Sequence, residues 1–367
     1  MTTIETSLPV TFNPGRAALR LVGSALVAFG VFLSGFVIAE PAPFDVYMAV
    51  LIGFWFILGL KISRTTAVLL AFMLVFMAGG FLSITQMEKI GDAPIYLAVT
   101  LFLCLSAVFL CAIIDEDHRR LKLIFNAWTA AAVTTAMLGI LGYFKAFPGA
   151  EIFTRYDRAM GAFQDPNVFG PFLIAPSLFL LHGILTEKIS GLPVRAIALG
   201  IISLGVLLSF SRAAWAMFAF SAAMMVLLMF IKERSGAFRL KVLIITLGGI
   251  VFCVVAIVVA LQIPQVADLL TSRTKLVQDY GWLGFITYIG LVWTTIWFGL
   301  RYMLRDRPWQ PYLLIGWIAI CGHELIGNVI DTDHWRHHFM LFGIVWGCIA
   351  LEHKYQRRRA RNAMEPA

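Results

Sequence analysis

The sequence predicts an all-α polytopic membrane protein with about twelve transmembrane helices and both termini in the cytoplasm. Two observations concern composition: 60% of the 367 residues are hydrophobic, and only 14% are charged, with a mean hydropathy of +0.85. Soluble proteins of this size carry about a quarter charged residues. The third observation is that long apolar runs recur along the chain, with lysine and arginine on alternate sides of them.

The apolar runs define the predicted spans. Each is bounded by charges or by Gly/Pro, and its backbone must be helical because lipid cannot satisfy free amide groups. The first run follows Arg16 and Arg20 and is too long for the core of a signal peptide, so we interpret it as an uncleaved span. The predicted spans are residues 18–38, 45–60, 66–85, 95–114, 122–144, 168–186, 194–210, 213–231, 240–262, 282–303, 311–328 and 338–351.

We expect one helical bundle over residues 18–352, preceded by a cytoplasmic segment at 1–17 and followed by a basic cytoplasmic tail at 353–367. The run Arg357–Arg359 is interpreted as an orientation signal followed by a disordered tail. All cysteines fall inside apolar runs, which favours inert buried thiols over disulfides or a cysteine-based metal site. They are Cys104, Cys111, Cys253, Cys321 and Cys348.

Charge distribution orients the spans. The net charge is +8, but the basic residues lie in short loops between spans, where they set topology; this argues against nucleic-acid binding. With the N-terminus inside, 21 of the 29 basic residues face the cytoplasm. The outward ones are Lys89, Lys145, Arg155, Arg158, Arg212, Arg273, Lys275 and Arg336.

The segment Arg155–Asn167 is the most informative outward loop. Arg155 and Arg158 lie three residues apart on a side where Lys and Arg are normally scarce. A guanidinium matches phosphate oxygens bidentately and does not lose its charge. We therefore interpret these arginines as candidates for binding an anionic substrate, with solvated loop charges as the alternative. Arg212 is another candidate, because it stands between two apolar runs with almost no loop around it.

The last outward segment is rich in histidine. His334, His337 and His338 are three of the chain's seven histidines. An imidazole there can act as a general base near neutral pH or contact phosphate. A metal site and an interfacial anchor are alternatives, and we expect no metal because the spacing fits no standard zinc pattern.

One carboxylate lies inside a predicted span. Glu324 follows His323 directly, and the two form a possible intramembrane pair. Asn328 lies four residues beyond Glu324 and therefore on the same helix face.

Three motifs, in order along the chain, resemble the O-antigen ligase and polymerase superfamily of bacterial inner-membrane enzymes. Residues 158–167 read R-x-x-G-x-F-x-x-P-N, similar to the family's loop that leads into a span. Residues 211–213 resemble its S-R-G/A element, and the G-x-x-G at 281–284 resembles the helix after its large periplasmic loop. Besides the arginines, these motifs contain Gly161, Phe163, Pro166, Asn167, Ser211, Gly281 and Gly284.

The resemblance implies transfer of a glycan from undecaprenyl diphosphate to a hydroxyl of an acceptor glycolipid or glycan, on the periplasmic side of the inner membrane. It implies an inverting glycosyltransferase of ligase or polymerase type, without metal or cofactor, in lipopolysaccharide or exopolysaccharide biogenesis. We expect the diphosphate to be bound by Arg158, Arg212 and Arg273, with Arg155 and Arg336 in reserve. We expect the base to be His337 or His334, oriented by Asp331 or Asp333.

One departure from the family pattern leaves alternatives open. The family's long loop before the Gly281 helix carries a histidine implicated in catalysis. Here only 18 residues separate Gln262 from Gly281, and none is histidine. Either the loop has been shortened by a deletion, which would leave a substrate-binding bundle with impaired chemistry, or another residue has taken that role. A non-catalytic membrane subunit that binds a polyprenyl lipid or a partner glycosyltransferase is a separate alternative. A twelve-span transporter or flippase is the remaining alternative, although transporters usually place charges and broken helices near the midplane.

Overall fold

The computed structural model describes residues 14–85, 91, 93–186, 191–232, 274–327 and 334–364 of the 367-residue chain. The predicted span at 240–262 and the candidates Arg273, Asn328, Asp331 and Asp333 lie outside these ranges. The helices are α1 (Pro14–Leu33), α2 (Pro43–Ile57), α3 (Arg64–Ile84), α4 (Ala93–Glu116), α5 (Arg120–Tyr143), α6 (Pro166–Phe172), α7 (Ile174–Thr186), α8 (Leu192–Leu208), α9 (Arg212–Lys232), α12 (Thr274–Tyr302), α13 (Gln310–Ile326) and α14 (Arg336–Met364). A short 3-10 helix, η1 (Ala150–Phe153), precedes the strands β1 (Thr154–Arg155) and β2 (Arg158–Ala159).

The prediction of an all-α membrane protein is confirmed. Among the residues that the structure describes, six stretches are long and apolar enough to cross a bilayer: Arg64–Ile84, Pro94–Glu116, Arg120–Tyr143, Pro166–Thr186, Arg212–Lys232 and Tyr280–Tyr302. Shorter apolar helices are Leu21–Leu33, Pro43–Ile57 and Leu192–Leu208. With 15 residues, α2 extends about 22 Å, less than the roughly 30 Å thickness of a hydrocarbon core. The twelve-span count therefore stays a prediction.

Apolar side chains on the surface of α12 support insertion in lipid. Trp282 and Trp293 are each 69% exposed, and Ile286 is 65% exposed. Their spacing of three to four residues, or multiples of it, places them on one helix face. Such a continuous apolar stripe would be unfavourable in water, whereas lipid tails would accommodate it.

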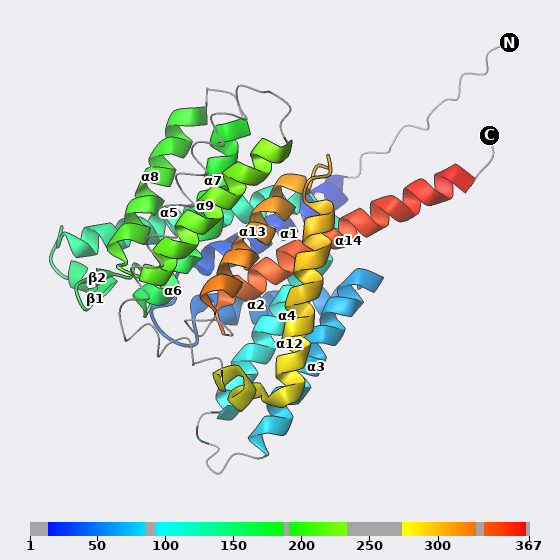
Figure 1. Ribbon diagram of the computed structural model, residues 1–367, viewed down its shortest axis with the longest axis horizontal. Helices are drawn as coiled ribbons and strands as arrows, with labels where there is room; N and C mark the ends of the chain where they lie inside the picture. The colour runs from blue at the N-terminus through cyan, green and yellow to red at the C-terminus, as the bar shows by residue number, and fades with distance from the viewer. Residues whose placement is uncertain are drawn as a thin grey trace.

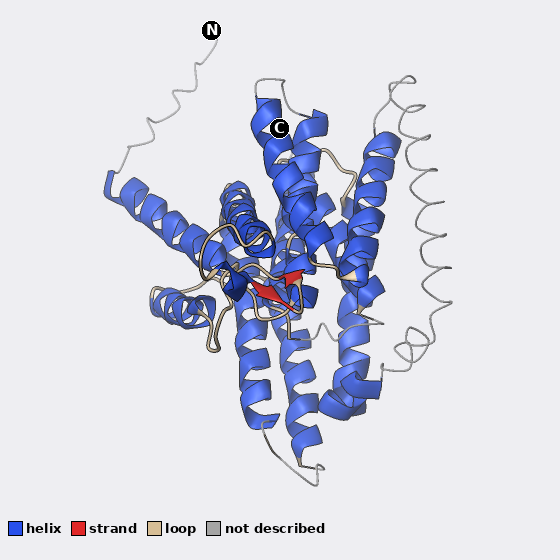
Figure 2. Cartoon of the chain, turned by 90° about the vertical axis from the view of Figure 1, so that its left-hand side faces the viewer, coloured by secondary structure: helices blue, strands red, loops and turns tan. Residues whose placement is uncertain are grey.

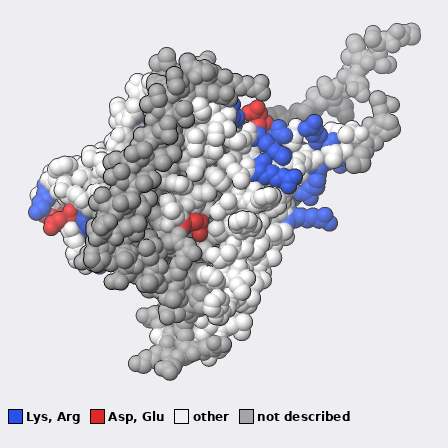
Figure 3. All heavy atoms as spheres, viewed as in Figure 1, with Lys and Arg blue, Asp and Glu red and all other residues white. Residues whose placement is uncertain are grey.

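The helices pack as two neighbouring groups joined through α14 and α13. In Figure 1, α3, α4 and α12 lie side by side, while α5, α7, α8 and α9 form the second group. Helix α14 packs on α4 and α13, and α13 packs on α9. On the face seen in Figure 3, lysine and arginine gather near the end of α14 that leaves the bundle.

Glycines permit the close approach of α3 and α12. A Cβ on Gly79 would overlap the backbone of Gly284, so both helices need their small residues at this crossing. Gly281 has φ 62° and interrupts the helical geometry of α12. The predicted opening of a helix at Gly281 thus corresponds to a break, followed by the apolar stretch that ends at Tyr302.

Two features differ from the sequence-based expectation. The apolar stretch at 168–186 contains two helices, α6 and α7, which meet at Leu173. Pro171 and Pro176 flank this junction and lack the backbone N–H that a continuous helix needs. The disordered basic tail was a wrong expectation for most of its length, since α14 continues through the arginine run to Met364.

Candidate functional site

The Arg155–Arg158 segment is a β-hairpin rather than an open loop. Arg155 pairs with Arg158 across a two-residue turn of Tyr156 and Asp157. Both turn residues have positive φ, 53° and 55°, which is the geometry of the mirror-image turns that match strand twist. Figure 2 shows the two strands facing the viewer in front of the helices. No glycine marks this turn, and the sequence analysis did not predict it.

Arg158 joins the hairpin to the start of α6 and to the turn before α9. Its Nε donates to the Ser209 carbonyl oxygen at 2.7 Å, and its NH2 group donates to Asn167 Oδ1 at 2.8 Å. Partial burial lowers the pKa of Arg158, the nearby Asp165 carboxylate raises it, and the positive charge of Arg212 lowers it. The first motif therefore bonds to the turn that precedes the second motif, and Arg212 of the second motif lies close enough for its charge to act on Arg158.

Gly161 and its neighbours hold the segment against the bundle. Gly161 has φ 56°, and a Cβ there would overlap the carbonyl of Thr135 on α5. The Ala162 N–H donates to Thr135 Oγ1 at 2.8 Å, and the Ala162 carbonyl accepts from the Val37 N–H at 2.7 Å. Phe163 packs its ring 4.9 Å from that of Phe172. The motif's glycine and phenylalanine therefore support the backbone of the site.

The start of α6 has the local chemistry of a helix N-terminus. Asp165 is the N-cap residue, and its Oδ1 accepts from the Asn167 N–H at 2.7 Å. Pro166 occupies the first helical turn, where its missing N–H costs nothing. This start fixes the position of Asn167, the acceptor for Arg158.

Arg212 and Arg155 are exposed beside Arg158. Arg212 is the first residue of α9, and Ser211, just before it, is buried. Within the described ranges, the Arg212 guanidinium has no hydrogen-bond or ion-pair partner. The Arg155 side chain donates to the Gln164 carbonyl oxygen at 2.9 Å. Three arginines thus lie around residues 155–167, and Arg212 is available to a ligand.

A pocket of about 190 Å³ adjoins this segment. One wall is the stretch Phe163–Asp165 together with Val168, and another is the chain after α1, from Ser34 to Glu40. The third wall is the start of α14, residues His334–His337. The structure therefore brings Phe163–Asp165, at the end of the arginine-rich loop, and the histidine-rich segment to one cavity; the arginines at 155, 158 and 212 are not part of its lining.

The imidazole groups near this pocket form a buried cluster. The ring centroid of His323 lies 5.0 Å from that of His337 and 5.1 Å from that of His338. His323 Nδ1 donates to the Ala319 carbonyl at 2.9 Å. The Nε2 atoms of His323 and His337 are buried, with no hydrogen-bond partner among the described residues. In the same ranges, no three His, Cys, Asp or Glu side chains have the arrangement of a metal site.

The expected pair of His323 and Glu324 takes a different form. Glu324 Oε1 accepts from the Tyr288 hydroxyl at 2.9 Å and lies 3.5 Å from His338 Nε2. The same hydroxyl lies 3.1 Å from His338 Nε2. Glu324 thus contacts the histidine cluster through His338 and Tyr288, because consecutive helical residues point in different directions.

His334 connects the pocket to the third motif. Its Nδ1 lies 3.0 Å from the hydroxyl of Tyr96 on α4, and the Tyr96 ring lies 6.4 Å from that of Tyr280. Tyr280 directly precedes Gly281, and its hydroxyl bonds to Thr100 Oγ1 at 3.0 Å. The glycine motif therefore lies near the histidine segment through a row of aromatic side chains.

Arg336 is held by a carboxylate. Its Nε donates to Asp45 Oδ1 at 2.7 Å, and its NH2 group donates to Asp45 Oδ2 at 2.6 Å. The two side chains are 11% and 13% exposed. The guanidinium N–H groups that would bind a phosphate are therefore already bonded to Asp45. Arg336 lines the pocket, and it is a poor candidate for binding an anion.

Several contributing residues were not predicted from the sequence. Asp45, Tyr96, Gln164 and Tyr288 all contact candidate residues. A tyrosine inside an apolar span is the one signal that could have singled out Tyr288, because a buried hydroxyl needs a partner.

Comparison with known proteins found no matching family model, no matching curated protein and no matching solved structure.

Proposed function

We propose that the chain is a membrane glycan transferase similar to the O-antigen ligases. It would move a glycan from undecaprenyl diphosphate to an acceptor hydroxyl at the periplasmic face of a bacterial inner membrane. The observation that carries the proposal is the convergence of Arg158, Asn167 and the Ser209–Arg212 turn beside a pocket lined by His334 and His337.

The arginines supply the electrostatic part of such a reaction. Arg212 and Arg158 are close enough for the charge of one to lower the pKa of the other. A diphosphate bound between them would relieve this repulsion and would have its developing charge stabilised as it leaves. Arg158 would orient the site through its two hydrogen bonds, and Arg212 would contact the diphosphate.

The histidines supply the proton acceptor. In the transfer, the acceptor oxygen bonds to the anomeric carbon, the bond from that carbon to the diphosphate oxygen breaks, and the base takes the hydroxyl proton. If His334 Nδ1–H donates to Tyr96, the lone pair lies on Nε2, as a general base requires. His337, also lining the pocket, is the second candidate base.

The proposed topology has twelve spans with cytoplasmic termini. It is supported by a second pocket, described below, whose lining includes Lys61 and Arg120 and which the C-terminal ends of α2 and α4 share with the start of α5. Alternating helices would place those three ends on one side of the membrane and the arginine loop on the other. The excess of Lys and Arg on the first side makes it cytoplasmic.

The test is glycan transfer in cells whose only copy carries Arg212→Ala, at wild-type membrane levels. Because Arg212 is exposed, its removal should leave folding intact while lowering transfer by about 10²-fold. Undecaprenyl-diphosphate-linked glycan should accumulate. Lys145→Asn is the matched control, since Lys145 is also an exposed outward cation and Asn tolerates its positive φ of 51°.

Wild-type transfer by Arg212→Ala would refute the assignment of this residue to the diphosphate. Substituting Gln separately for His334 and His337 tests the chemistry. If both variants transfer normally while Arg212→Ala does not, neither histidine by itself is the required proton acceptor, and the assignment of the base is refuted. Ion-coupled uptake in proteoliposomes would instead favour a transporter.

A further inference from the structure

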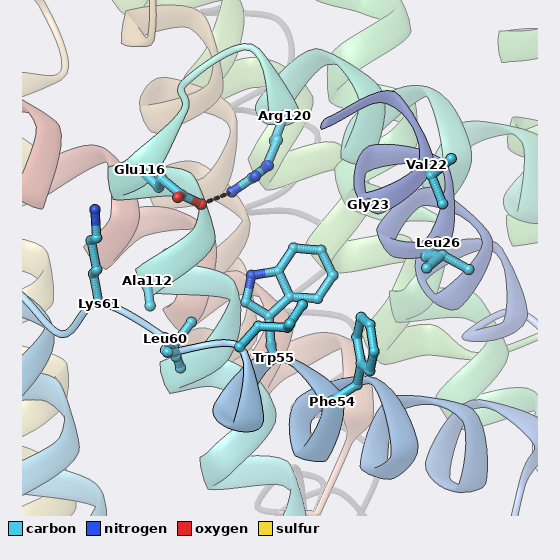
Figure 4. A pocket seen from close by; sticks show the side chains of 12 residues that line it. Val22, Gly23, Leu26, Phe54, Trp55, Leu60, Lys61, Ala112, Glu116 and Arg120 are labelled. Atoms are coloured by element: carbon cyan, nitrogen blue, oxygen red, sulfur yellow. Dashed lines mark hydrogen bonds and ion pairs between the residues drawn. The ribbon is translucent and has the colours of Figure 1, made fainter. Parts of the chain in front are cut away.

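A second pocket, of about 340 Å³, lies between four helices away from the candidate site. It is formed by the first half of α1, the C-terminal end of α2, the end of α4 and the start of α5 (Figure 4). The candidate site adjoins the opposite end of α1, after Leu33. This pocket is therefore independent of the proposed transfer reaction.

Most of the pocket wall is apolar. Its side chains continue onto the outer surface of the helices, where Val22 is 54%, Phe54 is 48% and Leu58 is 58% exposed. Aliphatic and aromatic groups therefore run without interruption from the cavity to the lipid-facing surface. The apolar lining residues are Val22, Leu26, Phe54, Trp55, Leu58 and Leu60.

The charged residues lining the pocket are Lys61, Glu116 and Arg120, labelled in Figure 4. One Arg120 nitrogen donates to Glu116 Oε2 at 2.7 Å and to the Ile113 carbonyl at 2.8 Å. Two cations against one carboxylate leave a net positive charge on the lining.

The Arg120 guanidinium is only partly satisfied. Arg120 is 7% exposed, and its Nε is buried without a hydrogen-bond partner in the described part of the chain. Its guanidinium also lies over the Trp55 ring, 5.8 Å from the centroid. An arginine buried among apolar groups is costly unless further acceptors reach it. Arg120 therefore places a charge at the pocket wall that Glu116 and the Ile113 carbonyl satisfy only in part.

We propose that this pocket binds an anionic phospholipid, with the phosphate beside Lys61 and the Arg120–Glu116 pair and an acyl chain along the apolar wall. Basic pockets between transmembrane helices bind such headgroups. The apolar wall favours a lipid over a free phosphate ion, because inorganic phosphate would leave that wall in contact with water. Bound lipid would tie α2, which is short for a span, to α1, α4 and α5.

The test is lipid retention by the full chain, measured by native mass spectrometry after mild delipidation. The probes are phosphatidylglycerol and phosphatidylcholine with the same acyl chains. We expect one phosphatidylglycerol to be retained in preference to phosphatidylcholine. Lys61→Gln should weaken this retention about fivefold. Lys61 is exposed, so the substitution leaves the helices intact.

Arg119→Gln is the matched control, because Arg119 is exposed next to Arg120 and does not line the pocket. It should retain phosphatidylglycerol as the wild type does. Equal retention of both lipids, or equal effects of Lys61→Gln and Arg119→Gln, would overturn the proposal. Displacement of the lipid by millimolar inorganic phosphate would also overturn it and assign the pocket to a free anion.

Discussion

The ion pair of Asp45 and Arg336 gives the sharpest prediction about stability. It joins the first turn of α2 to the first residue of α14 through two hydrogen bonds of 2.7 and 2.6 Å. Both side chains are nearly buried, at 13% and 11% exposure. Asp45→Asn would keep the size of the side chain and remove its charge, leaving Arg336 largely buried without its principal counter-ion.

Breaking a buried pair by removing one partner typically costs about 3–5 kcal/mol. We expect the lower end, about 3 kcal/mol, because Asn keeps one acceptor oxygen and Glu40 remains 3.5 Å from Arg336. The measurement is the free energy of unfolding of the purified protein in nanodiscs, relative to wild type. The double variant Asp45→Asn/Arg336→Gln should lose less stability than Asp45→Asn alone, because no uncompensated charge remains.

Glu40→Gln is the control for this prediction. Glu40 is 59% exposed, so its contribution to the same guanidinium should be below about 1 kcal/mol. If Asp45→Asn destabilises the protein no more than Glu40→Gln does, the buried ion pair is not a significant source of stability and the reasoning fails.

Three further predictions concern other parts of the chain. Burial, and after it the nearby Arg357, lowers the pKa of His353 below its usual 6.5. The folded state therefore binds this proton less readily than the unfolded state does. The free energy of unfolding should fall as the pH drops from about 6.5 through the folded pKa. His353→Gln should reduce the loss of unfolding free energy that is measured between pH 7.5 and pH 5. An unchanged loss would contradict the assignment to His353. Tyr156→Asn should raise stability by about 1 kcal/mol in the same unfolding assay, because Asn tolerates the positive φ of the hairpin turn; a loss of stability would show that the tyrosine ring contributes more than its backbone strain costs. Gly161→Ala should destabilise the protein and lower glycan transfer, since its Cβ would overlap the Thr135 carbonyl; unchanged transfer and melting would exclude this close packing.

Local sequence chemistry predicted the helices well. Long apolar runs must become helices in lipid. Asp165 and Pro166 are residue types that favour the first turn of a helix, where the structure places them. The apolar helix was expected to open at Gly281, where the structure has a break with positive φ that glycine adopts at little cost. Each of these features depends on residues that are neighbours in the chain.

Contacts between residues that are far apart in the sequence could not be predicted from local sequence chemistry. Nothing in the sequence pairs Asp45 with Arg336, which lie 291 positions apart. The hairpin turn uses Tyr156 and Asp157 where glycine or asparagine would be expected, so the surrounding packing fixes its shape. The continuation of α14 past residue 351 places Glu352 against Arg305 at 2.8 Å. The sequence analysis interpreted the following arginine run as an orientation signal and did not predict this contact.

The walls of the candidate pocket come from segments made at different times during synthesis. Ser34 and Val37 belong to the first part of the chain to emerge, whereas His334–His337 follow near its end. Because synthesis proceeds from the N-terminus, Asp45 enters the membrane long before Arg336 exists to neutralise it. A nascent chain therefore has no finished pocket, and the cavity becomes complete only when the start of α14 is in place and Arg336 pairs with Asp45.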